Sequence, residues 1–424
     1  MTRGFENYAP LGRVQDFIGE LTRGKATKET VDSRNAYGRV AAVNVTSPTD
    51  VPDRPRSHMD GYALLASDLR GASPRSPRVL RLKGRERSGA RTGQIRSGEV
   101  MWVATGEYLP SGADSVTPVE ETEMVGRKVA FRTERKKGDF CYKVGSDIVK
   151  GYQATADGRT IRAQDLGMLI LLGVSRLEVY SKPRIGLVAT GSELTSSTQE
   201  RDKSKVRESH IPIFENLIRE NGGEPVNFGI FPDDVERIAS ALEHALRTSR
   251  LVLTLGGTSL GERDLVEQAL RMIDRKSRII HGIRMDRGRV AGVAEVKGRP
   301  VLMLPGPVQA AMNAFVLMGI PSIWWLSGRK STARGVSATL MEDWVARRRF
   351  ENFTKVVYVR LARGRQGFEA HPVLKDTESM SVLTDSNGYV VVPERTKSLQ
   401  AGAQVQVKLL SGFSYARGRF LDEE

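Results

Sequence analysis

Residues 251–264 read Leu-Val-Leu-Thr-Leu-Gly-Gly-Thr-Ser-Leu-Gly-Glu-Arg-Asp: an apolar run, a glycine-rich turn and an acidic helix start. The run predicts a buried strand, and a helix is expected to begin near Glu262. Gly256, Gly257 and Gly261 permit positive φ, and the helix start directs unpaired N–H groups and its positive dipole end at the turn. The stretch predicts an anion pocket. The alternative is an ordinary βα loop whose glycines only make the turn.

Two polar side chains in this stretch add chemistry to the turn. Ser259 supplies a hydroxyl, and Asp264 supplies a carboxylate that can hold a divalent cation beside a phosphate. The stretch is therefore a candidate site for a phosphate with its metal ion.

Two further loops of this kind follow apolar runs typical of buried parallel strands. The run from Pro183 to Thr190 leads into Gly-Ser-Glu at 191–193. The run from Val301 to Leu304 leads into Pro-Gly-Pro at 305–307 and then into a long apolar helix. We interpret all three loops as parts of one ligand site.

Strand and helix patterns alternate between these loops. A helix is expected from about Ile211 to Glu220, a strand from Pro225 to Ile230, and a second helix with Asp233 or Asp234 as its N-cap. This alternation predicts a doubly wound α/β sheet. Because ligands bind outside the carboxyl ends of the strands in such sheets, the three loops are expected to share one edge.

The whole chain is expected to be a multidomain α/β protein, because 424 residues exceed one compact core. Residues 1–48 and 141–178 predict an N-terminal helical linker domain, and 49–140 an inserted small β domain of short strands. Residues 179–327 predict the doubly wound α/β domain, and 328–424 a C-terminal β-barrel-like domain.

The net charge of +15 indicates a partner that carries negative charge. The surplus gathers in two arginine-rich runs, from Arg70 to Arg96 and from Arg347 to Arg365. Neither run has the interleaved aromatic residues of a base-stacking surface, so a nucleic-acid partner is only an alternative. Solvated basic faces and a small anionic substrate are the other interpretations.

Composition also excludes several classes of protein. No apolar run of about 18 residues is evident, so no membrane span is expected, and the first residues lack the layout of a signal peptide. The single cysteine, Cys141, cannot form an internal disulfide, which indicates a reducing cytoplasm. The five histidines have no spacing typical of a zinc site, so no structural metal is expected.

Six motifs follow one another in a family-like order. They are Met59-Asp-Gly-Tyr-Ala63; Ala104-Thr-Gly106 with Leu109-Pro-Ser-Gly-Ala-Asp114; Gly145-Ser-Asp147; Arg184-Ile-Gly-Leu-Val-Ala-Thr-Gly-Ser-Glu-Leu194; Gly256-Gly-Thr-Ser-Leu-Gly-Glu-Arg-Asp264; and Leu304-Pro-Gly306. Together they resemble the molybdopterin molybdenumtransferase family, to which the gephyrin E domain belongs. The similarity runs from about residue 10 to 412.

The resemblance implies an enzyme of molybdenum cofactor synthesis. Such an enzyme inserts molybdate into the dithiolene of adenylylated molybdopterin and releases AMP in a magnesium-dependent reaction; tungstate is the alternative oxyanion. It also implies four domains and an elongated homodimer. The active site would lie in a cleft between the α/β domain of one subunit and the small β domain of the other.

The motif positions imply a set of site residues. The catalytic candidates are Asp60, Thr105, Glu193 and Asp264, with Asp264 also the Mg²⁺ ligand. The substrate-binding candidates are Asp147, Gly191, Ser192, Gly256, Gly257, Thr258, Ser259, Gly261, Arg289, Pro305 and Gly306. Asp60, Thr105 and Asp147 would reach across the dimer.

Three segments depart from the family pattern, as does Phe140, which stands where the family has an asparagine ahead of Gly145-Ser-Asp147. Residues 286–290 read Asp-Arg-Gly-Arg-Val in place of Lys-Pro-Gly-Lys-Pro, so only Arg289 keeps a positive charge at a lysine position. Glu208-Ser209-His210 replaces Asp-Ser-Asn, and Leu304-Pro-Gly-Pro-Val-Gln309 is also altered. These changes favour a second hypothesis, a pterin-binding paralogue or scaffold without catalysis. A nucleic-acid-binding protein, based only on the arginine runs, is the third.

Overall fold

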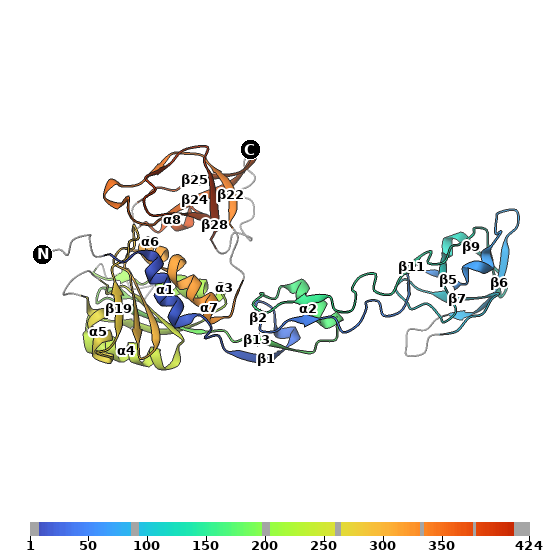
Figure 1. The fold of residues 1–424 in the computed structure, drawn as a ribbon, viewed down its shortest axis with the longest axis horizontal. Coiled ribbons are helices and arrows are strands. Elements are labelled where there is room, and N and C mark those ends of the chain that lie inside the picture. The colour runs from blue at the N-terminus through green and yellow to red at the C-terminus, as the bar shows by residue number, and fades with distance from the viewer. Residues whose placement is uncertain are drawn as a thin grey trace. The chain divides into compact units, whose positions relative to one another are not determined.

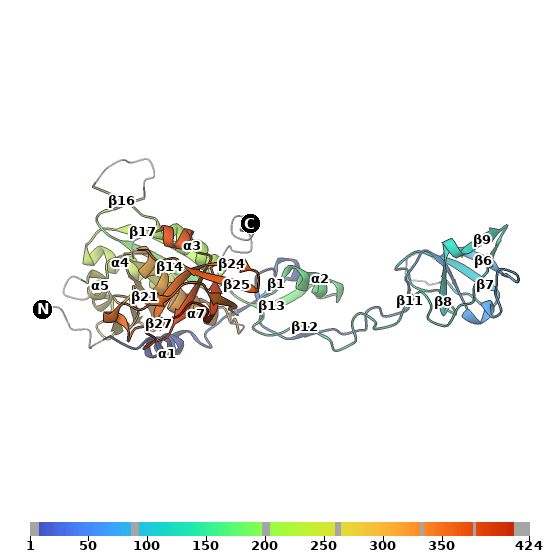
Figure 2. The ribbon, with the colours of Figure 1, turned by 90° about the horizontal axis from the view of Figure 1, so that it is seen from above.

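The computed structural model describes residues 8–85, 93–196, 204–258, 264–330, 335–375 and 379–410 (Figures 1 and 2). The chain forms two compact units. Unit 1 consists of Met1–Val43, Asp157–Leu166 and Arg176–Glu424, and unit 2 of Asn44–Ala156 and Gly167–Ser175. The chain enters unit 2 twice, at Asn44 and at Gly167, and both of these segments lie in its first half.

A six-stranded mixed sheet forms the centre of unit 1. Its order is β17 (Glu224–Phe231), β14 (Arg184–Thr190), β18 (Leu251–Leu255), β21 (Arg299–Leu304), β20 (Gly292–Val296) and β19 (Arg278–His281). The first four strands are parallel, and β20 and β19 join antiparallel. The sheet confirms the expected α/β class. The antiparallel pair at its edge was not predicted.

Helices cover both faces of this sheet because its central strands are apolar on both sides. Leu251, Leu253 and Leu255 belong to the core shared with α1 (Leu11–Thr22), α3 (His210–Glu220), α6 (Val308–Ala314) and α7 (Ile320–Leu326). Val252 belongs to the opposite core, with α4 (Val235–Thr248) and α5 (Leu265–Ile273). This arrangement is the doubly wound layout that the alternating pattern predicts.

One helical segment, Val308–Leu326, runs through α6, a π-helical turn (Phe315–Gly319) and α7. Pro321 has no N–H to donate to the carbonyl of Leu317 four residues earlier, and Gln15 Nε2 of α1 donates to that oxygen at 3.0 Å. The segment is long and apolar enough to span a membrane by composition, and 78% of its most apolar window is buried in the protein. The expectation that no such run exists is therefore wrong; burial makes this a core helix.

The C-terminal region closes into a five-stranded barrel, as expected. Its order is β22 (Val336–Leu340), β25 (Gly367–Pro372), β24 (Lys355–Gly364), β26 (Gly388–Val392) and β28 (Gln404–Leu409). Valines at alternate positions, such as Val357 and Val359, fill the interior. The short helix α8 (Ser381–Thr384) and the pair β23 (Trp344–Val345) and β27 (Ser398–Leu399) complete this region.

Unit 1 also contains two small sheets. The first has the order β1 (Lys28–Asp32), β13 (Arg176–Tyr180) and β2 (Val40–Ala41). The second pairs β15 (Leu194–Thr195) with β16 (Val206–Arg207) beside the end of β14. This second pair places residues 206–210 close to the loop at 191–193.

Unit 2 is built on a second six-stranded sheet. Its order is β8 (Ser115–Pro118), β5 (Gly61–Leu64), β7 (Glu99–Val103), β6 (Arg78–Arg85), β10 (Lys128–Phe131) and β9 (Thr122–Val125). Tyr62, Leu64 and Phe131 lie in its core. The pairs β4 (Arg56–Ser57) with β11 (Cys141–Tyr142) and β3 (Val45–Thr46) with β12 (Gln153–Thr155) lead into this sheet, and helix α2 (Ala163–Leu171) begins in unit 1.

Candidate ligand site at the carboxyl edge of the sheet

A cavity of about 530 Å³ lies at the carboxyl ends of β14, β18 and β21. Residues from all three predicted loops line it, among them Glu193, Gly256, Gly257 and Gly306. The beginning of α3 and Met380, from the C-terminal region, complete the wall. The three loops therefore share one edge of the sheet, as the topology rule predicts.

Gly256 and Gly257 have backbone conformations that exclude a side chain. Their φ angles are +84° and +66°. A Cβ on Gly256 would lie 2.8 Å from the carbonyl oxygen of Thr190, and one on Gly257 would lie 2.2 Å from Thr190 Oγ1. The N–H of Gly256 donates to Leu304 O at 3.1 Å. The glycines thus let β18 turn closely beside the ends of β14 and β21.

The loop after β14 is held by reciprocal hydrogen bonds. The N–H of Ser192 donates to Asp233 Oδ2 at 3.2 Å, and the N–H of Asp233 donates to Ser192 Oγ at 2.9 Å. Gly191 has φ +151°, and its N–H donates to Phe231 O at 3.0 Å. These bonds fix the loop and leave the exposed Glu193 on the cavity wall.

The start of α3 contributes residues that the sequence interpretation did not assign to the site. Glu208 Oε1 accepts the N–H groups of His210 and Ile211 at 2.7 and 3.0 Å, so this carboxylate caps the helix. Both Glu208 and His210 line the cavity. Burial lowers the pKa of His210, although Glu208 and the backbone of Gly306 favour its protonated form. The helix was expected from Ile211, which left His210 outside it.

Asp264 is the N-cap of α5 and is 3% exposed. Its Oδ1 accepts the N–H of Glu267 at 2.8 Å, and its Oδ2 lies 3.2 Å from His281 Nε2. The helix begins at Leu265, so the expected start near Glu262 is wrong: the Asp264 side chain takes the capping position instead of lying in the first turn. Asp264 is not among the residues that line the cavity.

His281 connects Asp264 to the next turn of the same helix. Its Nδ1 lies 3.1 Å from Glu267 Oε2. Burial alone would raise the pKa of Glu267, and hydrogen bonds from Arg271 and His281 outweigh burial and lower it. Within the described ranges, no group of three or more His, Cys, Asp or Glu side chains is arranged to hold a metal ion.

Several predicted site residues lie elsewhere. Ser259 and Gly261 fall outside the described residues. Pro305 is buried beside Gly306, and the buried Thr258 Oγ1 has no hydrogen-bond partner in the described part of the chain. Arg289 does not line the cavity; its guanidinium lies 5.4 Å from the ring centroid of Phe350. The structure thus places Arg289 against the C-terminal region.

Asp60, Thr105 and Asp147 lie in unit 2. The N–H and the hydroxyl of Thr105 donate to Asp60 Oδ1 at 2.7 and 2.9 Å, so two separate motifs meet. The N–H of Gly106 donates to Ser57 O at 2.8 Å, which ties these loops together. Asp147 is exposed, and its N–H donates to Val51 O at 3.1 Å.

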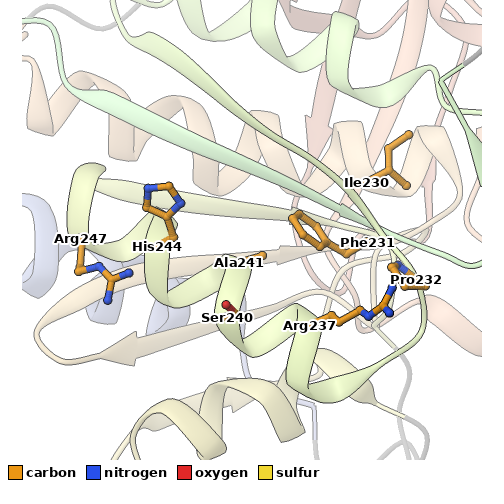
Figure 3. Close-up of a pocket in the computed structure, with 8 residues that line it drawn as sticks. All are labelled: Ile230, Phe231, Pro232, Arg237, Ser240, Ala241, His244 and Arg247. Carbon is orange, nitrogen blue, oxygen red and sulfur yellow. The ribbon is translucent and has the colours of Figure 1, made fainter.

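A second hollow, of about 640 Å³, lies on the outer side of α4 beside the end of β17 (Figure 3). Arg237, His244 and Arg247 project from α4 along it, and Phe231 and Pro232 close one end. None of the three glycine loops lines this hollow. Arg237 and Arg247 are exposed in this hollow, which lacks the glycine turns that line the first cavity.

An α/β sheet with a ligand cavity at its carboxyl edge, followed by a β-barrel region, is a binding fold for a small ligand. Residues 186–324 match the family model described as the probable molybdopterin binding domain. Residues 10–173 match the MoeA N-terminal region (domains I and II), and residues 337–410 match the MoeA C-terminal region (domain IV). The chain belongs to the MoeA family of molybdopterin molybdenumtransferases.

Relatives of known name match along nearly the full length. A putative molybdopterin biosynthesis protein of Methanocaldococcus jannaschii is 27% identical over 96% of this chain and 99% of its own length. Molybdopterin molybdenumtransferase 2 of Mycobacterium tuberculosis is 28% identical over 93% and 97%. The crystal structure of a molybdopterin biosynthesis MoeA protein from Pyrococcus horikoshii has 27% identity and a TM-score of 0.80, over 96% of this chain and all of its own.

Proposed function

We propose that this protein inserts molybdate or tungstate into adenylylated molybdopterin and releases AMP. The observation that carries the proposal is the cavity where the turns at Gly191, Gly256 and Gly306 meet at one sheet edge. Such an edge suits a small ligand such as an anionic heterocycle, because ligands of open α/β sheets bind outside the carboxyl ends of the strands. The net charge of +15 supports an anionic substrate, and we propose no nucleic-acid or membrane partner.

In the proposed reaction, water forms a bond to the adenylate phosphorus as the anhydride bond to the molybdopterin phosphate breaks, so AMP leaves and the phosphate stays on the pterin. Negative charge grows on the phosphate oxygens, and donors fixed in place beforehand stabilise it without reorganisation. In our proposal Gly256, Gly257 and Thr258 cradle the pterin and its phosphate. Glu193, exposed on the cavity wall, contacts the pterin or orients water.

Magnesium fits this donor set through Asp264. Mg²⁺ is usually held in proteins by one or two carboxylates together with substrate phosphates and water, so a cluster of three protein ligands is not required. In our proposal the Asp264 carboxylate would be one of these ligands. When bound, the ion would neutralise charge on phosphate oxygens.

We further propose a homodimer in which unit 2 supplies the rest of the site. Asp60 of the partner subunit, held by the partner's Thr105, and Asp147 of the partner subunit would face the cavity. The hydrogen-bonded pair in each subunit supports this proposal, because it presents one carboxylate in a fixed position. The single buried thiol of Cys141 supports a cytoplasmic location.

The test is AMP release. The purified protein is mixed with adenylylated molybdopterin, Mg²⁺ and either molybdate or tungstate, and AMP is followed with reconstitution of an apo-molybdoenzyme. AMP release that requires one oxyanion supports the proposal and names the metal. Absence of AMP release with both oxyanions overturns it.

The second candidate, a pterin-binding paralogue without catalysis, is favoured by the altered loop at 286–290. Asp286 forms an ion pair with Arg347, and Arg287 donates to Lys375 O at 2.6 Å. Arg289 contacts the Phe350 ring. The charged side chains of this loop therefore interact with other residues of the same chain. Tight molybdopterin binding without AMP release is the result expected of this candidate.

A further inference from the structure

Two polar atoms on the cavity wall are buried without a hydrogen-bond partner in the described part of the chain: Thr190 Oγ1 and His210 Nε2. Thr190 is 2% exposed. A buried polar atom without a partner costs free energy, so its presence in a native site calls for an explanation. A bound ligand that supplies the missing hydrogen bonds would explain both atoms.

Each of these two residues lies at the end of a helix or strand and packs closely against a neighbour. Thr190 is the last residue of β14, and its hydroxyl occupies the space that a Cβ on Gly257 would take. His210 is the first residue of α3, where its imidazole stacks on Phe214 with a ring-centroid distance of 6.3 Å. Thr190 and His210 thus line one cavity from two different elements.

The surroundings of His210 bear on where its ring carries a proton. Nδ1 lies 3.7 Å from Glu208 Oε1, beyond hydrogen-bond distance, and a hydrogen bond to the Gly306 backbone also favours a protonated ring nitrogen. In the tautomer with the proton on Nδ1, on the side of Glu208, Nε2 keeps a lone pair. Burial, which lowers the pKa of His210, further favours this neutral form near pH 7.

We propose that Thr190 and His210 determine specificity by recognising a nitrogen heterocycle through its N–H groups. His210 Nε2 accepts from a ring or amino N–H, and the Thr190 hydroxyl, which can donate or accept, bonds the adjacent ring atom. This inference rests on the proposed function, in which the heterocycle is a pterin. The phosphate is then bound by the glycine turns rather than by these two side chains.

Thr254 provides a matched control. It lies on β18 beside β14, is fully buried, and its Oγ1 likewise has no partner in the described part of the chain. Unlike Thr190, it does not line the cavity. Replacing either threonine by valine removes a buried hydroxyl and keeps the branched shape, so only a ligand contact distinguishes the two variants.

The experiment measures the Kd for molybdopterin and the Tm of the ligand-free protein for the wild type, Thr190→Val, His210→Leu, His210→Gln and Thr254→Val. Thr190→Val and His210→Leu are expected to weaken binding about tenfold each, which is the usual effect of one lost hydrogen bond. Thr190→Val should not lower Tm, because it removes an unpartnered group. His210→Gln, whose side-chain oxygen can accept, should recover part of the affinity, and Thr254→Val should leave it unchanged.

Two competitors separate the heterocycle from the phosphate. Competition by 6-hydroxymethylpterin, which carries no phosphate, should weaken in Thr190→Val and His210→Leu, while competition by inorganic phosphate stays as in the wild type. Unchanged molybdopterin affinity in both variants, or a loss confined to phosphate competition, overturns the inference alone. A wild-type protein that does not bind molybdopterin overturns the proposed function and this inference together.

Discussion

Gly257 and Gly306 both line the cavity, but only Gly257 lacks room for a side chain. A Cβ on Gly257 would lie 2.2 Å from Thr190 Oγ1 at a φ of +66°, whereas a Cβ on Gly306 meets no atom within 4 Å. We expect Gly257→Ala to lower the free energy of unfolding by about 1–3 kcal/mol, and Gly306→Ala to change it by less than about 0.5 kcal/mol. Urea unfolding of both variants is the measurement, and equal stability would contradict the steric argument.

Asp264 has a structural and a proposed catalytic role, and two substitutions separate them. Asparagine caps helices as well as aspartate does, so Asp264→Asn should keep the cap on α5, while Asp264→Ala should cost about 1 kcal/mol. If the carboxylate holds Mg²⁺, both variants should release AMP about a hundredfold more slowly. Thermal unfolding and AMP release are measured together. Wild-type turnover in Asp264→Asn would remove this carboxylate from the mechanism.

At the scale of elements, Glu99 links strands β7 and β6. A hydrogen bond from Arg81, with help from the Arg96 N–H and Lys83, lowers the pKa of Glu99 to about 2 from an ordinary value of 4.5. A lowered pKa means that Glu99 contributes stability above pH 4.5, and that this contribution is lost as the pH falls from 4.5 toward 2. Glu99→Gln should therefore have a lower Tm than the wild type at pH 7, with a difference that shrinks toward pH 2.

The control for this pH series is Glu123→Gln on β9. Glu123 pairs with Arg132, and both side chains are more than half exposed. Exposed pairs contribute little, so the Tm of this variant should follow that of the wild type at every pH. A constant Tm difference for Glu99→Gln from pH 7 to pH 2 would show that Glu99 acts without its charge.

Helices and strands that are determined by a local sequence pattern could be predicted from the sequence. The strand at 251–255 has the expected bounds, since its apolar residues face a core on both sides. The helix after it begins at Leu265 rather than near Glu262, because either acidic residue can begin a helix and only packing selects one. The π-helical turn was not predicted; the carbonyl of Leu317 within it accepts from Gln15 of α1, 302 residues away, a contact that no local pattern indicates.

The cavity itself was only partly predictable. Glycine loops after apolar strands indicated the correct edge of the sheet through the rule that ligands bind there. Thr190 was assigned to a strand, and His210 was noted only as a departure from a family pattern. Their polar atoms become buried without a hydrogen-bond partner only when distant segments pack together, so a local sequence pattern does not indicate them. Met380 joins the wall from a segment about 170 residues beyond His210, which no local pattern indicates.

At the scale of the whole molecule, buried hydrogen bonds join the α/β sheet region to the C-terminal barrel within unit 1. The hydroxyl of Tyr358, on β24, donates to Asn313 Oδ1 of α6 at 2.9 Å, and Asn313 Nδ2 donates to Arg287 O at 2.8 Å. Both side chains are almost fully buried. Tyr358→Phe leaves the Asn313 oxygen without its donor, so we expect a loss of about 1–3 kcal/mol.

Tyr389→Phe is the control for Tyr358→Phe. The Tyr389 ring lies 6.4 Å from that of Tyr358, and its hydroxyl makes no hydrogen bond to the described residues. Chemical unfolding should therefore show a smaller loss for Tyr389→Phe, while near-ultraviolet circular dichroism reports the packing of both rings. Equal losses would mean that the hydrogen bond across the two regions contributes nothing to stability.

The apolar segment Val308–Leu326 also has a consequence for synthesis of the chain. Its packing partners α1, β14, β18 and β21 precede it in the sequence, whereas Tyr358 and Val382, in the same core, follow it. When the ribosome releases this segment, α1 and the sheet strands that cover it have already been made. An exposed stretch of this composition would attract chaperones or membranes. The order of the elements along the polypeptide shortens that exposure, so a circular permutant that begins at residue 308 should aggregate more during translation than the natural order.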